Sequence, residues 1–387
     1  MRKTVYATSI IFMAMIICTT GCGKKEKILE VAYPTVIEEI DGVKTVHNPD
    51  YPKEGTFCYD LVMELSLGGP EAEGDAILVR PIEFQLDNQG NIYIMDWREV
   101  AIKAFNPDGN YLRTVSKKGQ GPGEFDIPAY FRIVNDHIYL LDSRQRKFSL
   151  LTLKGEYLKG FKIEGFPSAF DVAPDGNVYY SQMLNPEVEL GESIQKIKTS
   201  FALLKTGAKG GERNKLGEFR DRVQLKRMTK SSSGQVGIVS STSREAYTTS
   251  WFVGPQGKIY LGYNKDYDLE VRDEKWNTLL KFGRDFTPQS HPDYSSERGH
   301  PEFYPAFSDW HKFFDDKGNL WLEQYPIQDG EDHAFDVFSS DGIYLRKVIV
   351  PEVLSAIKGD TAYGFTRDEE GYVTFNRYKM VPLEEQK

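Results

Sequence analysis

The side chains with the clearest capacity for recognition are aromatic and basic residues that directly follow short apolar segments. Trp97 and Arg98 come directly after Asp96, and Arg144 follows Asp142 in a similar way. A Trp ring beside a guanidinium can stack on a sugar ring or hold a carboxylate. These residues therefore predict a binding site with an Arg-bearing rim; the alternative is a packed Trp beside a solvated Arg.

Asp96 and Asp142 themselves are predicted to be structural. Both close an apolar segment at an equivalent place in the sequence pattern. A carboxylate in that place accepts hydrogen bonds from backbone N–H groups of the following turn. Repetition at equivalent positions favours this structural role over catalysis.

Candidate metal ligands and catalytic groups are few. His291, His300 and His311 lie close in sequence, but one stretch supplies all three. A metal site in a ring of repeats would draw its ligands from several repeats, and zinc needs at least three protein ligands. The sequence contains no nucleophile elbow, phosphate-binding loop or zincin helix. We therefore predict no metal, no cofactor and no catalytic residue.

Short alternating apolar segments bounded by Gly, Asn or Asp recur along the chain, and long segments of helical periodicity are absent. One unit runs from Ile82 to Ser116 and predicts four strands. Its turns end at Gly90 and Gly109, and glycine there allows the positive φ that tight turns require. This pattern is typical of one four-stranded blade of a β-propeller.

A triplet of apolar or aromatic residues marks the second strand of each unit. The triplets are centred on Tyr93, Tyr139, Tyr179, Tyr260, Trp321 and, more weakly, Val373. The longest step, from Tyr179 to Tyr260, contains a polar stretch at about 181–245. We interpret that stretch as an insertion in the third blade rather than as a seventh blade. Six copies predict a six-bladed β-propeller.

The last unit is incomplete, because after two strands, at about 362–366 and 372–378, there is room for at most one short strand more before Lys387. Near the N-terminus the segment Leu61–Leu67 has no unit of its own. We predict that this segment completes the last blade and closes the ring, since an open ring would leave a sheet edge free. The predicted fold is all-β: a six-bladed propeller of four-stranded antiparallel blades over residues 59–387.

In a propeller, the loops after second strands and the starts of first strands surround one mouth. Long loops on such a rigid ring commonly carry function. The candidate ligand-binding residues are those that fall in these places: Arg80, Trp97, Arg98, Tyr130, Arg144, Trp310 and His311.

A connecting motif runs from Gly119 through Gly121, Gly123 and Phe125 to Pro128, and it resembles the motif that joins blades in NHL-repeat propellers. The whole layout, from about residue 59 to 380, resembles the six-bladed propeller lipoproteins of Bacteroidetes-type bacteria. The resemblance implies the propeller fold. Six-bladed propellers related to NHL repeats include lyases and lactone hydrolases with a channel-bound metal, so the resemblance leaves such an activity open.

The first residues indicate an export signal. Arg2 and Lys3 precede an apolar run that ends at Cys18 and is too short to span a bilayer comfortably. The residues before Cys22 resemble the lipobox of bacterial lipoproteins, although Thr19 stands where that family usually has Leu. The resemblance implies a signal peptide over 1–21 and a lipid on Cys22; the alternative is an ordinary secretory signal.

Residues 22–58 are predicted to form a tether and an N-terminal hairpin. The segments Val36–Ile40 and Val43–Val46 flank Asp41-Gly42, a strong two-residue turn signal, and we expect the hairpin to pack on the propeller. If Cys18 leaves with the signal and Cys22 is lipidated, one thiol, Cys58, remains. We therefore expect no internal disulfide.

The formal net charge is −9, which disfavours nucleic acid as a partner because phosphates attract a basic surface. Membrane attachment is then expected through the lipid anchor, at the cell envelope, on the periplasmic or outer surface of the outer membrane. The predicted function is a non-catalytic binding module for a glycan, a peptide or an envelope protein. The alternatives are the metal-dependent lyase or lactone hydrolase and a structural subunit of an envelope complex.

Overall fold

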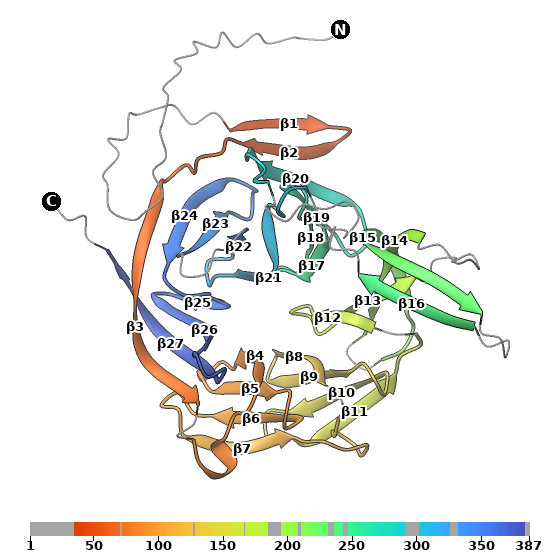
Figure 1. The fold of residues 1–387 in the computed structure, drawn as a ribbon, viewed down its shortest axis with the longest axis vertical. Helices are drawn as coiled ribbons and strands as arrows, with labels where there is room; N and C mark the ends of the chain where they lie inside the picture. The colour runs from red at the N-terminus through yellow and green to blue at the C-terminus, as the bar shows by residue number, and fades with distance from the viewer. Residues whose placement is uncertain are drawn as a thin grey trace, which may run out of the picture.

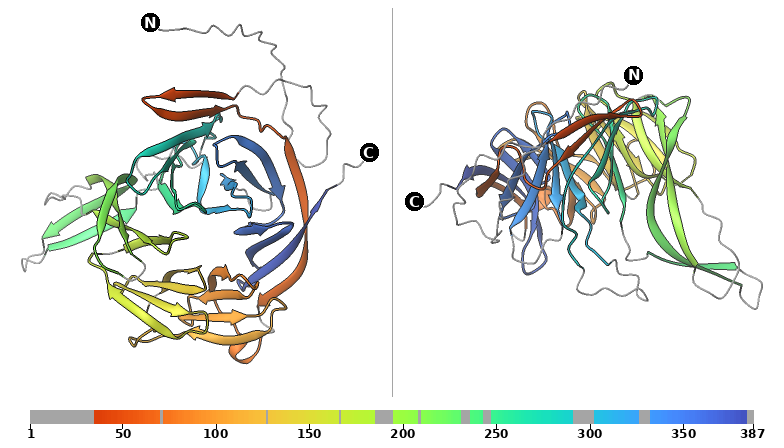
Figure 2. Two further views of the ribbon diagram at one scale, coloured as in Figure 1. Left: turned by 180° about the vertical axis from the view of Figure 1, so that it is seen from behind. Right: turned by 90° about the horizontal axis from the view of Figure 1, so that it is seen from above.

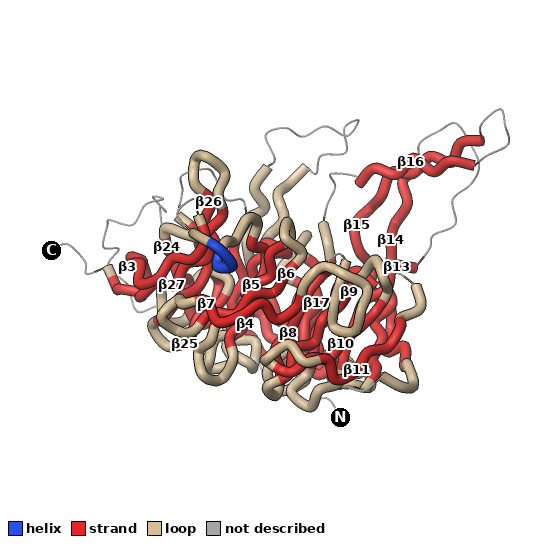
Figure 3. The backbone as a smooth tube through the Cα atoms, turned by 90° about the horizontal axis from the view of Figure 1, so that it is seen from below, coloured by secondary structure: helices blue, strands red, loops and turns tan. Residues whose placement is uncertain are grey.

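A computed structural model describes residues 35–69, 72–126, 128–165, 167–184, 195–207, 210–230, 236–242, 247–290, 302–325 and 332–383. Within these residues the strands form six blades around a central axis (Figure 1). The predicted signal peptide and Cys22 lie outside the described residues. A short 3₁₀ helix, η1 (Gly74–Ala76), precedes the first blade and is coloured blue in Figure 3.

The first two blades are regular four-stranded antiparallel sheets. Blade one consists of β4 (Pro81–Leu86), β5 (Ile92–Asp96), β6 (Ala101–Phe105) and β7 (Tyr111–Ser116). Blade two consists of β8 (Pro128–Val134), β9 (His137–Asp142), β10 (Lys147–Thr152) and β11 (Tyr157–Lys162). In each of these blades, the strand that comes first in the sequence lies nearest the central axis, as predicted for a propeller blade.

Blade three is enlarged. Its sheet contains β12 (Pro167–Val172), β13 (Val178–Leu184), β14 (Gln195–Thr206), β15 (Asn214–Lys230) and β16 (Val236–Thr242). The stretch interpreted as an insertion therefore contains the blade's own third and fourth strands, β14 and β15, which are lengthened, and an additional strand, β16. Figures 2 and 3 show this extension projecting beyond the ring.

Blade four carries the N-terminal hairpin on its outer edge. Its strands are β17 (Thr249–Val253), β18 (Ile259–Tyr263), β19 (Asp268–Arg272) and β20 (Thr278–Arg284). The predicted hairpin is present as β1 (Val36–Ile40) and β2 (Val43–Asn48), with positive φ at Asp41 (52°) and Gly42 (79°). Strand β2 pairs in parallel with β20, so the hairpin packs on the propeller as expected.

Blades five and six share one continuous sheet. Blade five consists of β21 (Phe307–Phe314), β22 (Leu320–Gln324), β23 (His333–Phe338) and β24 (Tyr344–Val350). Blade six consists of β25 (Ala356–Lys358), β26 (Thr361–Arg367) and β27 (Val373–Pro382), with β3 (Thr56–Gly68) antiparallel to β27. The prediction did not include the three-residue strand β25. It therefore numbered the strands of blade six wrongly: counted from β25, β27 is the third strand of the blade and not the second.

The turns inside the blades have a common chemical cause. The side chain of an Asp or Asn accepts a hydrogen bond from the backbone N–H four residues later, at 2.7–2.8 Å, in the turns that begin at Asp87, Asn106, Asp273 and Asp315. Such Asx turns fix the chain reversal locally. This explains why the Asp/Asn-bounded segments of the sequence become separate strands.

The core lies between neighbouring blades. The central residues of the first five predicted triplets are all at most 7% exposed: Tyr93, Tyr139, Tyr179, Tyr260 and Trp321. Aromatic contacts continue across the junction of blades six and one, where the ring centroids of Phe84 and Phe375 are 4.8 Å apart. In blades one to five both faces of the second strand are largely buried, which explains why these segments are apolar without strict alternation.

Cys58, near the start of β3, is disulfide-bonded. The expectation that its thiol remains unpaired is therefore wrong. The two other cysteines of the chain, Cys18 and Cys22, lie outside the described residues.

Candidate functional site

One face of the ring carries the starts of the innermost strands and the ends of the second strands. Pro81 pairs with Asp96 in blade one, and Pro128 pairs with Asp142 in blade two. We call this side the mouth face. All the candidate residues with described side chains lie on or near it.

The two aspartates that close β5 and β9 anchor the mouth loops. The buried carboxylate of Asp96 accepts hydrogen bonds from the backbone N–H groups of Val79, Arg80, Arg98 and Glu99. Asp142 accepts two such bonds, from Asp126 and Gln145, both at 2.7 Å. The structural role predicted for both is confirmed.

Arg80 and Trp97, from the two loops that Asp96 anchors, contact each other. The backbone N–H of Trp97 donates to the carbonyl oxygen of Arg80 at 2.9 Å, and the guanidinium carbon lies 4.8 Å from the Trp97 ring centroid. This is a cation–π contact, which covers one face of the indole. Trp97 is still 41% exposed, and Arg98 beside it is exposed, so both remain accessible to a ligand.

Fewer hydrogen bonds hold the equivalent loop of blade two. Arg144 has a side chain that is 65% exposed, and its Nη1 lies 3.5 Å from Asp126 Oδ2. Tyr130, in β8, is half-buried. Burial raises the pKa of the Tyr130 phenol, and the negative charges of Glu83 and Asp309 raise it further, so the phenol stays protonated at neutral pH.

Blade five presents the most exposed large aromatic side chain of the described residues, Trp310, at 77%. It lies in a bulge of β21, where the pairing with β22 jumps from Phe307 to Lys312. The hydroxyl of Ser308 accepts hydrogen bonds from the backbone N–H groups of Trp310 (3.2 Å) and His311 (3.4 Å). Bulges of this kind redirect side chains away from the regular pleat, and this one directs the indole to solvent.

A buried carboxylate orients His311. Glu323, in β22, is 0% exposed, and its two oxygens bind His311 Nδ1 and, at 2.7 Å, His333 Nδ1. Burial raises the pKa of Glu323, but the hydrogen bonds from the two imidazoles outweigh that effect and lower it overall. An ionised Glu323 requires both Nδ1 atoms to donate, so the lone pair of a neutral His311 lies on Nε2.

Sequence reasoning missed a charged network along the axis. Arg132, in β8, binds Glu83 of β4 through Nη1 and Asp171 of β12 through Nε at 2.9 Å. Asp171 in turn accepts a hydrogen bond from the backbone N–H of Val253 in β17 at 2.8 Å. Arg132 and Asp171 together thereby connect the innermost strands of blades one to four.

The electrostatics of this network reflect its burial. Burial raises the pKa of Glu83 above its usual range despite the neighbouring Arg132. Burial would lower the pKa of Arg132, but the charges of Glu83 and Asp171 outweigh this and raise it. On the facing blade, burial lowers the pKa of Lys312 to about 8, and the charge of Arg132 contributes in the same direction.

A signal for this network was present in the sequence. The innermost strands of blades one, two and three each place a charged residue next to a buried phenylalanine: Glu83-Phe84, Phe131-Arg132 and Phe170-Asp171. Because neighbouring residues of a strand point to opposite faces, a charge beside the core phenylalanine points away from that core. An alignment of the repeat units by their first strands would have found it.

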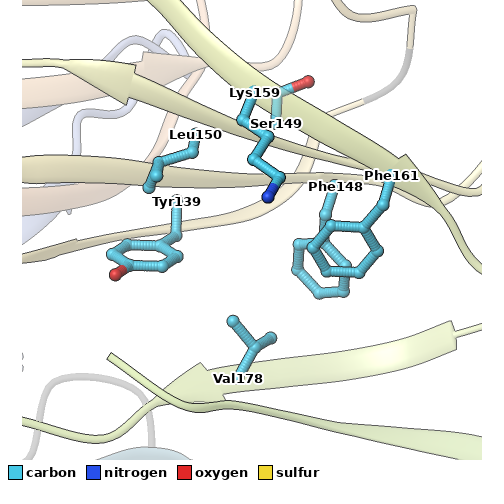
Figure 4. Close-up of a pocket in the computed structure, with 7 residues that line it drawn as sticks. All are labelled: Tyr139, Phe148, Ser149, Leu150, Lys159, Phe161 and Val178. Atoms are coloured by element: carbon cyan, nitrogen blue, oxygen red, sulfur yellow. The ribbon is translucent and has the colours of Figure 1, made fainter. Parts of the chain in front are cut away.

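The described residues contain no group of three or more His, Cys, Asp or Glu side chains arranged to hold a metal ion. Two cavities in the described part of the chain are lined by none of the candidate residues. One, of about 10 Å³, lies between blades two and three beside Phe148, Phe161 and Val178 (Figure 4), and holds about one water at most. The other is an open hollow of about 330 Å³ beside Lys205 and Glu274.

No helix in the described part of the chain is long and apolar enough to cross a membrane. Cys22, the predicted lipidation site, lies outside those residues. The lipid anchor therefore stays a prediction.

The sequence of residues 74–218 matches a domain family described as a 6-bladed beta-propeller. No curated protein matches the chain in sequence. Among solved structures, a member of the DUF4221 family from Bacteroides vulgatus is similar, with 11% identity, coverage of 84% of this chain and 99% of that one, and a TM-score of 0.51.

Two further solved structures have lower TM-scores. A Bacteroides fragilis protein proposed to be exported shares 13% identity over 84% of this chain and 99% of that one, with a TM-score of 0.43. Virginiamycin B lyase from Staphylococcus aureus shares 11% identity over 78% and 96%, with a TM-score of 0.41. At these identities the likeness concerns the fold alone.

Proposed function

We propose that this protein is a lipid-anchored, extracytoplasmic propeller that acts as a non-catalytic binding module. Its ligand is a glycan, a peptide or an envelope protein, held on the mouth face. The observation that carries the proposal is the bulge of β21, which exposes 77% of Trp310 to solvent and in which Ser308 binds the Trp310 backbone N–H. A large aromatic side chain exposed on a rigid support is typical of a binding site, because it offers contact area at little cost in conformational entropy.

The test is binding of the purified mature domain to cell-envelope fractions of the producing bacterium, with three single variants beside the wild type. Trp97→Ala, Arg144→Ala and Trp310→Ala remove side chains that are exposed on the mouth face. Leu158→Ala is the matched control, since Leu158 is 47% exposed on the outer strand of blade two. We expect Trp310→Ala to weaken binding at least tenfold and the control to leave it unchanged. Unchanged binding by all three mouth variants would refute the proposed site.

The anchor rests on the basic residues, apolar run and cysteine at the N-terminus. A lipid thioether at Cys22 and a disulfide between Cys22 and another cysteine exclude each other, since both use the same sulfur. Mass spectrometry of the mature protein from membranes should find a diacylated, N-acylated Cys22 at the N-terminus. An unmodified N-terminus in the soluble fraction would contradict the anchor.

Ring closure is a further part of the proposal. Strand β3 pairs with β27 over nine residue pairs, from Gly68 with Thr374 to Tyr59 with Pro382, and then leads through η1 into blade one. Its Leu67 is buried in the same core cluster as Phe84 of blade one and Phe375 of blade six. We infer that β3 closes the ring by joining the last blade to the first.

A further inference from the structure

The surroundings of Trp310 indicate which chemistry a ligand on the mouth face would need. Two neighbouring side chains in the same bulge bear hydrogen-bond acceptors. Asp309 is half-buried, and its Oδ2 accepts a hydrogen bond from Thr248 Oγ1 at 3.1 Å. His311 donates through Nδ1 to Glu323, which leaves Nε2 as an acceptor when the imidazole is neutral.

More aromatic surface borders this bulge. The ring centroids of Tyr304, just before β21, and Tyr325, just after β22, lie 5.5 Å apart, and Tyr325 is 42% exposed. Burial raises the pKa of Tyr325, and the nearby Asp309 carboxylate contributes to the rise. Tyr325, Asp309 and Trp310 therefore lie near one another. Aromatic rings and a carboxylate acceptor are both available to a ligand in this part of the surface.

The arginines described above on the mouth face, including the exposed Arg98, belong to blades one and two rather than to the bulge of blade five. Arg80 packs on Trp97, Arg144 lies near Asp126, and Arg132 is held between Glu83 and Asp171. A carboxylate or phosphate on a ligand at the bulge would therefore meet the Asp309 carboxylate, and the neighbouring cation, the half-buried Lys312, already donates to the Asp309 carbonyl oxygen. A ligand with many hydroxyl donors and an apolar ring face would match both the acceptors and the aromatic surface.

We propose that the bulge of β21 binds a neutral saccharide, with one pyranose ring stacked on Trp310 and its hydroxyls donating to Asp309 and to His311 Nε2. The proposal rests on the binding function proposed above and specifies its ligand class. Glu323 acts as a positioning residue, because it fixes the imidazole that receives the hydroxyl. Tyr325 extends the aromatic surface toward the neighbouring sugar unit.

The test is isothermal titration calorimetry of the full mature chain with three classes of oligosaccharide. The neutral probes are cellohexaose, mannohexaose and xylohexaose; the cationic probe is a chitosan hexamer, and the anionic probe is an oligogalacturonate. We expect at least one neutral probe to bind, with a tenfold or greater loss in Trp310→Ala and a partial loss in Trp310→Phe. Asp309→Asn should weaken binding several-fold, whereas Leu158→Ala should bind like the wild type.

The outcomes separate this inference from the function on which it rests. If only the chitosan hexamer or the oligogalacturonate binds, the site recognises charge and the neutral-saccharide proposal is wrong. If none of the probes binds but Trp310→Ala still abolishes binding to envelope fractions, the binding module stands and the saccharide class is overturned. If Trp310→Ala changes neither kind of binding, the saccharide site on the bulge is wrong, and if Trp97→Ala and Arg144→Ala also leave envelope binding unchanged, both proposals fail.

Discussion

Single side chains at the strand ends determine how the mouth face is built. Asp96 and Asp142 hold the loops of blades one and two through backbone N–H groups, and Asn264 does the same in blade four, where its Oδ1 accepts from the backbone N–H of Thr248 at 2.7 Å. An amide therefore serves in the same place as a carboxylate. The requirement at this position is a short side chain with an acceptor oxygen, rather than a negative charge.

This interpretation predicts different outcomes for two substitutions of Asp96. Asp96→Ala leaves four backbone donors without their partner in a buried site and should lower the free energy of unfolding by about 2–4 kcal/mol. Asp96→Asn keeps an acceptor oxygen for two of the four donors but places its NH2 group against the other two, so it should cost less than Asp96→Ala without restoring wild-type stability. Urea denaturation measures both, with Asp108→Ala, in an exposed turn, as the control. Equal losses of unfolding free energy in the two Asp96 variants would show that a single acceptor oxygen is not enough and that the charged carboxylate is required.

Glu323 makes the stability of blade five depend on pH. Its pKa is lowered in the folded protein, so its ionisation stabilises the fold above the unfolded-state pKa of about 4.5, and this contribution is lost as pH falls through the lower folded value. Wild type should therefore exceed Glu323→Gln in unfolding free energy at pH 6, and the difference should shrink below pH 4.5. Denaturant titrations at pH 6, 5, 4 and 3.5 measure this. A difference that grows on acidification would contradict the ionised state.

At the scale of the strands, the sequence pattern predicted most of what is regular and little of what is irregular. The apolar triplets and Asx turns identified the second strands of five blades, because burial and turn chemistry are both local signals. The strand β25 was missed because three residues carry no periodicity. The bulge of β21 was missed as well, since its cause, the pairing of Phe307 and Lys312 with β22, involves residues distant in sequence. Trp310 and His311 were named as candidates, but Glu323, which orients His311, was not.

The proposed role of β3 can be tested by changing where the chain begins. Tyr59 pairs with Pro382, so a short linker can join the end of β27 to the start of β3 as an antiparallel hairpin. A circular permutant that starts at residue 73, continues to 383 and ends with residues 58–69 should fold with an unfolding midpoint close to that of residues 58–383. The same permutant without residues 58–69 leaves a sheet edge open and should aggregate. If that shorter chain is a soluble, cooperatively unfolding monomer, β3 does not close the ring.

At the scale of the whole molecule, two sets of polar contacts hold the blades in register. On the axis, Arg132 connects blades one, two and three. Between blades four and five, the fully buried Asp336 binds Arg284 at 2.8 Å and also contacts the hydroxyl of Tyr267. Apolar packing between blades is tolerant of small shifts, whereas hydrogen bonds to charged groups demand specific geometry. We infer that these contacts fix the relative positions of the blades and thereby the geometry of the mouth face.

The axial network gives the prediction that belongs to the whole ring. Arg132→Ala leaves Glu83 and Asp171 partly buried without their counter-charge, and we expect a loss of about 3 kcal/mol in unfolding free energy. The combined variant Glu83→Gln, Arg132→Met, Asp171→Asn removes all three charges and should recover at least half of that loss, because most of the damage comes from unpaired acids rather than from a missing attraction. Urea denaturation at pH 7 measures both. If the triple variant is no more stable than Arg132→Ala, the network stabilises the ring by its attraction itself, and the blades depend on that charge pairing rather than on apolar packing.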